Sequence, residues 1–253
     1  MLLDNKIALI TGAMGSFGQA ISQAFVNEGA SLILTDVVKS SKVVDRYPNN
    51  DFIQADISTV EGTRELCHRI INEIGHVDIL INNAGLQYIS SVDEFPEDEW
   101  IKIIQVMLVA PFQITKHLLP TMKKREWGRI INMSSIHGLV ASPYKSAYVS
   151  AKHGIVGLTK AVALEVGTYG ITVNAICPGY SDTPLVRNQL AEQARIHVVS
   201  ERDALQNIML EPAAIPELIK PEEIASLAVF LSSDNSRSIT GTAISIDNGW
   251  TAR

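Results

Sequence analysis

Residues 7–18 read IALITGAMGSFG, and this stretch decides the fold. Its first five residues, Ile7–Thr11, form a short and mostly apolar run, which predicts a strand buried between helices. Gly12, Gly15 and Gly18 follow at once, and apolar residues then recur at helical spacing. A glycine turn lets backbone N–H groups approach a phosphate, which the positive end of the helix dipole also attracts. The stretch therefore predicts the phosphate-binding turn of a dinucleotide site.

Short β-rich runs alternate with longer segments of helical periodicity along the whole chain. The predicted strands are Ile7–Thr11, Ser31–Thr35, Asp51–Ala55, Val77–Asn82, Gly128–Met133, Ile171–Ala175 and Ala243–Ile246. The predicted helices are Gly18–Glu28, Thr59–Ile74, Glu97–Lys124, Ser146–Tyr169 and Pro221–Leu231. This order is typical of an α/β fold of the Rossmann type, a doubly wound seven-stranded parallel sheet with helices on both faces. We expect residues 1–253 to form a single domain, because no linker or repeat interrupts them.

The segment from Pro184 to Lys220 follows neither a strand pattern nor one uninterrupted helical pattern. Pro212 and Pro216 break it, and its charged residues make it polar. We interpret residues 184–220 as a small helical lid over a substrate site, with a solvated excursion of no special function as the alternative.

The net charge of −6 makes a nucleic acid or an acidic membrane surface an unfavourable partner, because both require basic residues. The two cysteines, Cys67 and Cys177, and the six histidines show no metal-ligand spacing, so no metal site is expected. The N-terminus has no secretion signal, and no window approaches the ~18 uninterrupted apolar residues of a membrane span. The composition therefore favours a soluble, cytoplasmic protein with a small-molecule ligand.

Asp36 directly follows the second predicted strand. A carboxylate there can accept hydrogen bonds from the adenosine ribose hydroxyls and would repel a 2′-phosphate. The residue therefore favours NAD over NADP, although a solvated loop acid is the alternative for Asp36 taken alone.

Tyr148 and Lys152 are spaced i, i+4 on a predicted helix, so their side chains project from one face. A nearby ammonium is expected to lower the phenol pKa from its usual ~10 and make Tyr148 a better acid or base. Ser135 follows the fifth predicted strand and can donate a hydrogen bond to a carbonyl oxygen on which negative charge develops. Each residue alone has an ordinary structural interpretation, but the set predicts a catalytic acid–base unit.

Several motifs recur in order at strand ends: Asn82-Asn83-Ala84-Gly85, then Ser135, then Tyr148 with Lys152, then Pro178-Gly179 with Thr183. With these motifs the sequence resembles the short-chain dehydrogenase/reductase family over essentially its whole length. The resemblance implies an oxidoreductase that uses NAD and commonly forms a homotetramer. The cofactor-binding residues that it implies are Thr11, Gly12, Gly15, Ser16, Phe17, Gly18, Asp36, Asp56, Ile57, Asn83, Ala84, Gly85, Tyr148, Lys152, Pro178, Gly179 and Thr183. Among these, Asp56 and Ile57 are expected beside the adenine, Thr183 at the nicotinamide amide and Lys152 at the nicotinamide ribose.

The sequence departs from the family pattern at two places. The family's middle glycine falls at position 16, whereas this chain has Gly15 followed by Ser16, which affects the expected loop conformation. Many members carry an Asn that holds a water in a proton relay, where this chain has Met107. Because a thioether cannot donate a hydrogen bond, either the relay is arranged differently or turnover is reduced. Core packing is the ordinary interpretation of Met107.

Within the family, the sequence also resembles the bacterial D-3-hydroxybutyrate dehydrogenases. The resemblance rests on Gln87, on His137-Gly138-Leu139-Val140, on Lys145 and Gln189, and on the ending Gly249-Trp250-Thr251-Ala252-Arg253. It implies that Gln87, His137, Lys145 and Gln189 bind a substrate carboxylate, and that Tyr180 and Trp250 also contact the substrate, with Tyr180 standing where many of these enzymes carry Trp. The implied reaction is the reversible oxidation of D-3-hydroxybutyrate to acetoacetate.

Two alternatives stay open at this point. One is a dehydrogenase of the same family that acts on another hydroxy acid, a sugar or a polyol. The other is an NAD-binding sensor with weakened catalysis, which Met107 and the altered glycine turn make conceivable.

Overall fold

The computed structural model describes residues 1–38, 45–48 and 50–252. Seven strands of this described part form one parallel sheet in the order β3-β2-β1-β4-β5-β6-β7, which confirms the predicted fold class. The strands are β1 (Ile7–Thr11), β2 (Ser31–Asp36), β3 (Asp51–Gln54), β4 (Ile79–Asn82), β5 (Gly128–Met133), β6 (Ile171–Pro178) and β7 (Ala243–Ile246). The winding direction reverses between β1 and β4, where crevices for ligands form in open α/β sheets.

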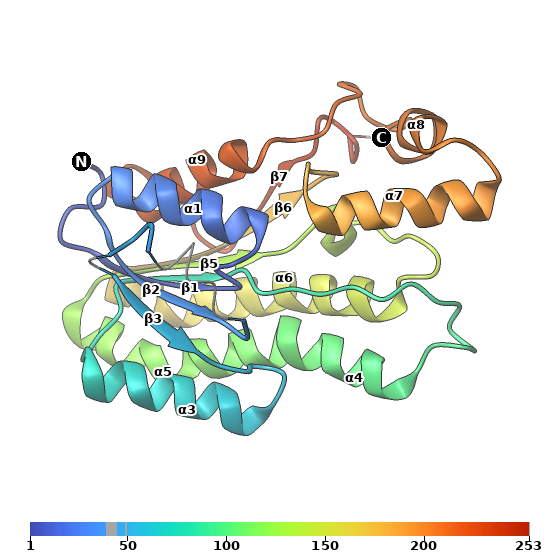
Figure 1. Ribbon diagram of the computed structural model, residues 1–253. Coiled ribbons are helices and arrows are strands. Elements are labelled where there is room, and N and C mark those ends of the chain that lie inside the picture. Colours follow the sequence, from blue (N-terminus) through green and yellow to red (C-terminus); the bar gives the residue numbers. More distant parts are fainter. Residues whose placement is uncertain (39–44, 49, 253) are drawn as a thin grey trace.

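Helices cover both faces of the sheet (Figure 1). One face carries α1 (Ser16–Asn27) and α9 (Pro221–Ser232), and the other carries α3 (Val60–Glu73), α4 (Glu97–Ile104), α5 (Ala110–Arg125) and α6 (Ser146–Val166). Consecutive strand residues alternate between these two layers: Ile10 packs in the α1 and α9 layer, and Leu9 packs in the α3, α5 and α6 layer. Both layers are apolar, which explains why β1 and β4 carry hydrophobic residues at consecutive positions.

Most predicted boundaries differ from the observed ones by one or two residues. Two boundaries differ by three residues: α6 ends at Val166 and not at Tyr169, and β6 continues beyond the predicted end at Ala175 to Pro178. The extra residues are strand because β7 pairs with them, with Cys177 opposite Ser245 and Pro178 opposite Ile246. This pairing is non-local, so the apolar pattern of β6 alone could not indicate where the strand ends.

A π-helical turn, η1 (Gln105–Val109), interrupts the predicted helix Glu97–Lys124 between α4 and α5. The N–H of Ala110 donates to the carbonyl of Gln105, five residues back, instead of four. Such turns often occur at functional sites, and this one contains the buried Met107. The whole helical stretch, Glu97–Arg125, is long and apolar enough to cross a membrane, but it packs against α3 and α6 in the way of a core helix.

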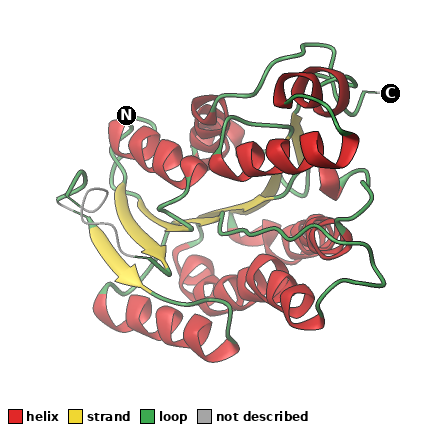
Figure 2. Cartoon of the chain, turned by 45° about the vertical axis from the view of Figure 1, so that its right-hand side comes forward, coloured by secondary structure: helices red, strands yellow, loops and turns green. Residues whose placement is uncertain are grey.

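The segment predicted as a lid contains α7 (Pro184–His197), α8 (Glu201–Ala204) and a second π-helical turn, η4 (Leu205–Met209). It is therefore helical and interrupted, as predicted. Figures 1 and 2 show α7 and α8 on the same side of the sheet as α1, and the C-terminus lies close to α8. Thr183 caps α7 by accepting a hydrogen bond from the N–H of Val186.

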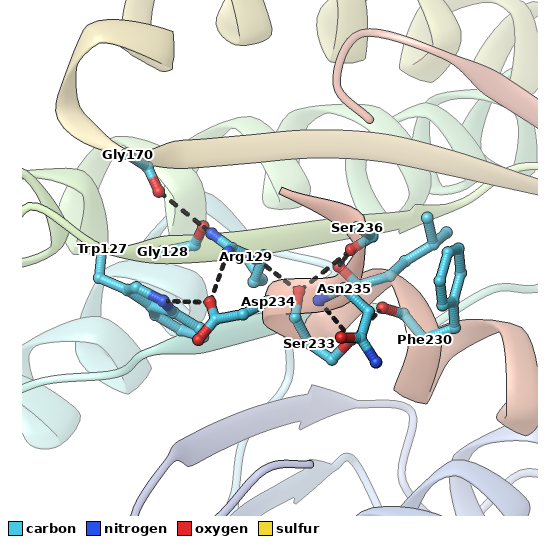
Figure 3. Close-up of polar contacts among 10 residues, drawn as sticks. Trp127, Gly128, Arg129, Gly170, Phe230, Ser233, Asp234, Asn235 and Ser236 are labelled. Atoms are coloured by element: carbon cyan, nitrogen blue, oxygen red, sulfur yellow. Dashed lines mark hydrogen bonds and ion pairs between the residues drawn. The ribbon is translucent and has the colours of Figure 1, made fainter. Parts of the chain in front are cut away.

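At the amino end of β5, Arg129 joins three parts of the chain (Figure 3). The side chain is 3% exposed, and its guanidinium donates to the carbonyl oxygens of Ser233 (3.3 Å), Gly128 (2.8 Å) and Gly170 (3.1 Å). It also pairs with Asp234 at 3.0 Å. These contacts hold β5 to the residue before β6 and to the residues that follow α9. They lie at the amino ends of the strands, opposite the carboxyl ends.

Replacing Arg129 by Met is expected to lower the free energy of unfolding by about 2–4 kcal/mol, because buried carbonyl groups lose their donors. Asp234→Ala is the matched control. It should cost less than about 1 kcal/mol, because the Asp234 side chain is 76% exposed and its pairing is screened. Urea denaturation of both variants measures the difference. Equal losses in the two variants would contradict the assignment of the stabilisation to the carbonyl contacts.

Candidate active site

The carboxyl ends of the strands border two cavities, one of about 720 Å3 and one of about 70 Å3. The large cavity is lined by the glycine turn after β1 and by the segments after β2, β3 and β4. The small cavity is lined by residues that follow β4, β5 and β6 and by α7. Four residues line both cavities: Phe17, Ser134, Tyr148 and Thr183. The two cavities therefore meet at these side chains.

The glycine turn needs glycine at two of its three positions. Gly12 has a φ of +63°, and a β-carbon there would lie 2.7 Å from the Cα of Ala84. A β-carbon on Gly18 would collide with the carbonyl of Gly12, so Gly18 permits the tight packing of the turn and does not itself line the large cavity. The contact of Gly18 with the cofactor stays a prediction.

Gly15, by contrast, has a φ of −73° and precedes α1 as its N-cap. Ser16 is the first residue of that helix, and neither position requires left-handed backbone. The order Gly15-Ser16 is therefore compatible with the turn. Both residues line the large cavity.

Hydrogen bonds hold the end of β1 to the end of β4. The hydroxyl oxygen of Thr11 accepts from the N–H groups of Asn83 (2.9 Å) and Ala84 (3.0 Å). The side-chain amide of Asn83 donates to the carbonyl oxygens of Thr11 (2.9 Å) and Gly12 (3.0 Å). These bonds place Asn83, Ala84 and Gly85 in the wall of the large cavity.

Asp36 also borders the large cavity, and its carboxylate accepts from the N–H groups of Met14 (3.0 Å) and Val38 (3.2 Å). Asp56 and Ile57 lie along the same cavity. Hydrogen bonds from Ser58 hold the pKa of Asp56 below its usual value. Lys102 of α4 was not predicted, although it lines this cavity, because one lysine on an exposed helix face carries no sequence signal.

The three predicted catalytic residues come together at the junction of the cavities. Tyr148 and Lys152 are on the first turns of α6, and Ser135 directly precedes the short helix η2 (Ile136–Gly138) after β5. The hydroxyl groups of Ser135 and Tyr148 are hydrogen bonded to each other. The ammonium of Lys152 donates to the carbonyl oxygen of Met133 at 2.5 Å and lies 5.5 Å from the centroid of the Tyr148 ring.

Burial controls the acidity of this group. It raises the pKa of Tyr148 to about 12, an effect that the hydrogen bond from Ser135 opposes, and it lowers the pKa of Lys152 to about 8. The expectation that Lys152 lowers the pKa of Tyr148 is therefore wrong for the protein alone. Desolvation of this partly buried phenol outweighs the attraction of an ammonium that faces the ring and binds a carbonyl.

The four residues predicted to bind a carboxylate form one polar cluster at the small cavity. The ammonium of Lys145 donates to Oε1 of Gln189 at 3.1 Å and lies 3.4 Å from Nε2 of His137. The amide of Gln189 donates in turn to Oε1 of Gln87 at 2.6 Å. These residues come from the segment after β4, from η2, from the residue before α6 and from α7, so only the tertiary structure unites them.

The electrostatics of this polar cluster suit an anion. Burial, and then the charge of Lys145, lowers the pKa of His137 to about 3, so the imidazole is neutral near pH 7. Because Lys145 donates to Nε2, we assign the proton of the ring to Nδ1. Among the described residues, Nδ1 of His137 and Nε2 of Gln87 are both buried without a partner. Two unused neutral donors and one ammonium therefore lie together, which is the donor set that a carboxylate requires.

Three further predicted site residues lie at or beside the small cavity. Trp250 does not line the small cavity; its ring packs edge-to-face against His137 at 6.3 Å, and its indole N–H donates to Met209 at 3.1 Å. Pro178 and Gly179 line the small cavity, so their contacts with the cofactor stay predictions.

Tyr180 does line the small cavity, with the ammonium of Lys145 5.7 Å from the centroid of its ring. Arg253, the last residue of the C-terminal motif, lies outside the described residues.

Met107 is 2% exposed and lies between the large cavity and a small apolar cluster that includes Ala147 and Ala151. It therefore packs in the core and borders the predicted cofactor site at the same time. A thioether in this place offers no hydrogen-bond donor to Lys152, so a proton relay cannot pass through this side chain.

The chain matches the family model described as short chain dehydrogenase over residues 6–194, and it belongs to that family. A D-beta-hydroxybutyrate dehydrogenase of Rhizobium meliloti is 43% identical to it, with 98% of this chain and 99% of the relative covered. A D-beta-hydroxybutyrate dehydrogenase of Cupriavidus necator is 39% identical, with both chains covered completely. The 3-oxoacyl-[acyl-carrier-protein] reductase FabG of Thermotoga maritima is 33% identical over 98% of this chain and 99% of its own.

The buried ammonium of Lys145 gives a prediction for stability. Burial lowers its pKa from 10.5 to about 8, so between these values the unfolded chain binds a proton that the folded chain has released. The free energy of unfolding therefore rises as the pH rises from about 8 to 10.5, because the folded chain releases this proton first. Below pH 8 the ammonium is charged in both states, and its burial lowers the free energy of unfolding by the full amount. Without a ligand, Lys145→Met should be more stable than the wild type at pH 7, by about 1–3 kcal/mol, and this gain should shrink towards pH 10.

Urea denaturation at pH 7 and pH 10 tests this prediction, with the exposed Lys124→Met as the control for loss of a charge. A Lys145→Met variant that is less stable than the wild type at both values would refute it.

Proposed function

We propose that this protein catalyses the reversible, NAD-dependent oxidation of D-3-hydroxybutyrate to acetoacetate. The observation that carries the proposal is the buried polar cluster of Lys145, His137, Gln87 and Gln189 beside Ser135, Tyr148 and Lys152. The names of the relatives from Rhizobium meliloti and Cupriavidus necator support the same substrate.

In the proposed complex, the substrate carboxylate accepts hydrogen bonds from Lys145, from Nδ1 of His137 and from the amide of Gln87. These contacts satisfy two polar groups that otherwise lack a partner among the described residues. They also fix the orientation of a short acid, so that its hydroxyl-bearing carbon lies at the junction of the two cavities. The small volume of the cavity, about 70 Å3, favours a short acid over a long one.

The large cavity fits a dinucleotide, because the glycine turn can accept a pyrophosphate and Asp36 can accept from ribose hydroxyls. When bound, NAD+ supplies the acceptor for the hydride that leaves C3. In its deprotonated form, Tyr148 would take the hydroxyl proton, so that the O–H and C–H bonds break as the C=O bond forms. Burial alone disfavours this form, whereas the positive charges of Lys152 and of bound NAD+ would favour it. Ser135 would donate a hydrogen bond to the same oxygen, and Lys152 would also hold the nicotinamide ribose.

Further parts of the proposal follow from the family resemblance and the composition. We propose a single domain with NAD, not NADP, as the cofactor, a lid function for residues 184–220 and a homotetrameric assembly. The site is expected to accept a small hydroxy acid or keto acid, with neither nucleic acid nor membrane as a partner, in a cytoplasmic location.

Initial rates of NADH formation from NAD+ and D-3-hydroxybutyrate test the proposed function. Tyr148→Phe should lower kcat by about 100- to 10,000-fold, because the general acid–base group is lost. Lys145→Met should raise KM for the acid by about 10- to 100-fold, because a charged hydrogen bond to the carboxylate is lost. Tyr169→Phe, at an exposed position of the short helix η3 (Gly167–Tyr169) that follows α6, should leave both constants unchanged.

The L enantiomer and a neutral polyol complete this experiment. If the wild type oxidises a neutral polyol but not the D acid, the assignment of a carboxylate site is wrong. If it binds NADH but reduces no carbonyl compound, the interpretation as a sensor holds instead.

The choice of NAD gives a separate prediction for Asp36. Asp36→Ala should lower kcat/KM for NAD+ and shift the preference towards NADP+ by about tenfold or more, since it removes both an acceptor for the ribose hydroxyls and the repulsion of a 2′-phosphate. Asp51→Ala, an exposed acid at the start of the neighbouring β3, should leave the preference unchanged. Parallel kinetics with both cofactors measure the shift, and an unaltered ratio in Asp36→Ala would rule out this role.

A further inference from the structure

Phe17 differs chemically from the other residues at the junction of the two cavities. Ser134, Tyr148 and Thr183 also line both cavities, and each carries a hydroxyl group. Phe17 alone of these four side chains can make no hydrogen bond to a ligand. Its role at this place must therefore be one of shape and apolar contact.

The backbone that carries Phe17 has little freedom to retreat. The residue is the second of α1 and precedes Gly18, where even a β-carbon would lie 2.7 Å from the Cα of Ala13. Its side chain also packs against the apolar core between the sheet and α1. A close-packed neighbourhood of this kind resists displacement, so the ring is a fixed wall of both cavities.

The proposed chemistry places the substrate beside this wall. C3 must lie near the hydroxyl of Tyr148 and also face the large cavity, so it must lie at the junction. The carboxylate occupies the polar cluster around Lys145, which leaves the alkyl group on C3 to lie among the junction residues. Val186 is a further apolar residue of the small cavity, but it does not border the large one and so flanks the acid away from the reacting carbon.

We propose that Phe17 is a specificity-determining residue, whose ring limits the alkyl group on C3 of the hydroxy acid to about the size of a methyl group. This inference rests on the proposed function and names a role for a residue of the glycine turn in the selection of the acid. Because the same ring borders the proposed cofactor site, this one side chain contacts both the hydroxy acid and the cofactor in the proposed complex.

The test compares kcat/KM for D-3-hydroxypentanoate and D-3-hydroxybutyrate at saturating NAD+. In Phe17→Ala the ratio of the longer to the shorter acid should rise by about tenfold or more, which is the discrimination that one methylene group supports in an apolar pocket. Phe17→Leu should change the ratio in the same direction by a smaller factor. Because Phe17→Leu keeps an apolar side chain against the core, it tests the proposal even if Phe17→Ala does not fold.

Met14→Ala is the matched control, because Met14 belongs to the same turn but lines only the large cavity. It should leave the ratio of the two acids unchanged, even if the KM for NAD+ changes. A wild type that oxidises D-3-hydroxybutyrate, with an unaltered ratio in both Phe17 variants, overturns the role of Phe17 alone. A wild type that oxidises neither acid overturns the proposed function, and the role of Phe17 with it.

Discussion

The hydrogen bonds that join the end of β1 to the end of β4 are the constraint on which the site depends. Thr11 and Asn83 exchange these bonds at the place where the sheet reverses its winding direction. Gly12 makes the close approach of the two strand ends possible, because no side chain fits between it and Ala84. The large cavity is built on this junction, and α1, which carries Phe17 to the small cavity, starts from it.

Buried cations occur at both ends of the sheet, and their surroundings differ in a way that matches their roles. Arg129, at the amino end, has three carbonyl oxygens and Asp234 as acceptors, so its charge is well satisfied. Lys145 and Lys152, at the carboxyl end, have amide, imidazole or carbonyl acceptors, and in the described part of the chain no carboxylate pairs with either. Such burial costs free energy, which an anion bound beside these ammonium groups would offset.

Local patterns predicted the elements well, because strand and helix periodicity depends on residues that are near in sequence. Local patterns did not predict those features that depend on contacts with residues distant in the sequence. The strand β6 runs on to Pro178 since β7 lies beside it, and the helix around Met107 contains a π-helical turn that no periodicity indicated. The family resemblance named most residues that border the cavities, and the tertiary structure adds that the ring of Trp250 packs against His137.

The sequence by itself determined the strand–turn–helix unit of residues 7–18, the parallel sheet and the polar residues that follow its strands. These features depend on neighbouring residues and on the general rule that parallel strands end at one edge. Only the tertiary structure decided which groups lie within hydrogen-bonding distance and how their acidity changes. The pKa of Tyr148 rises, although the i, i+4 spacing from Lys152 predicted a fall, because desolvation is set by every element packed around the phenol and not by one neighbour on its helix.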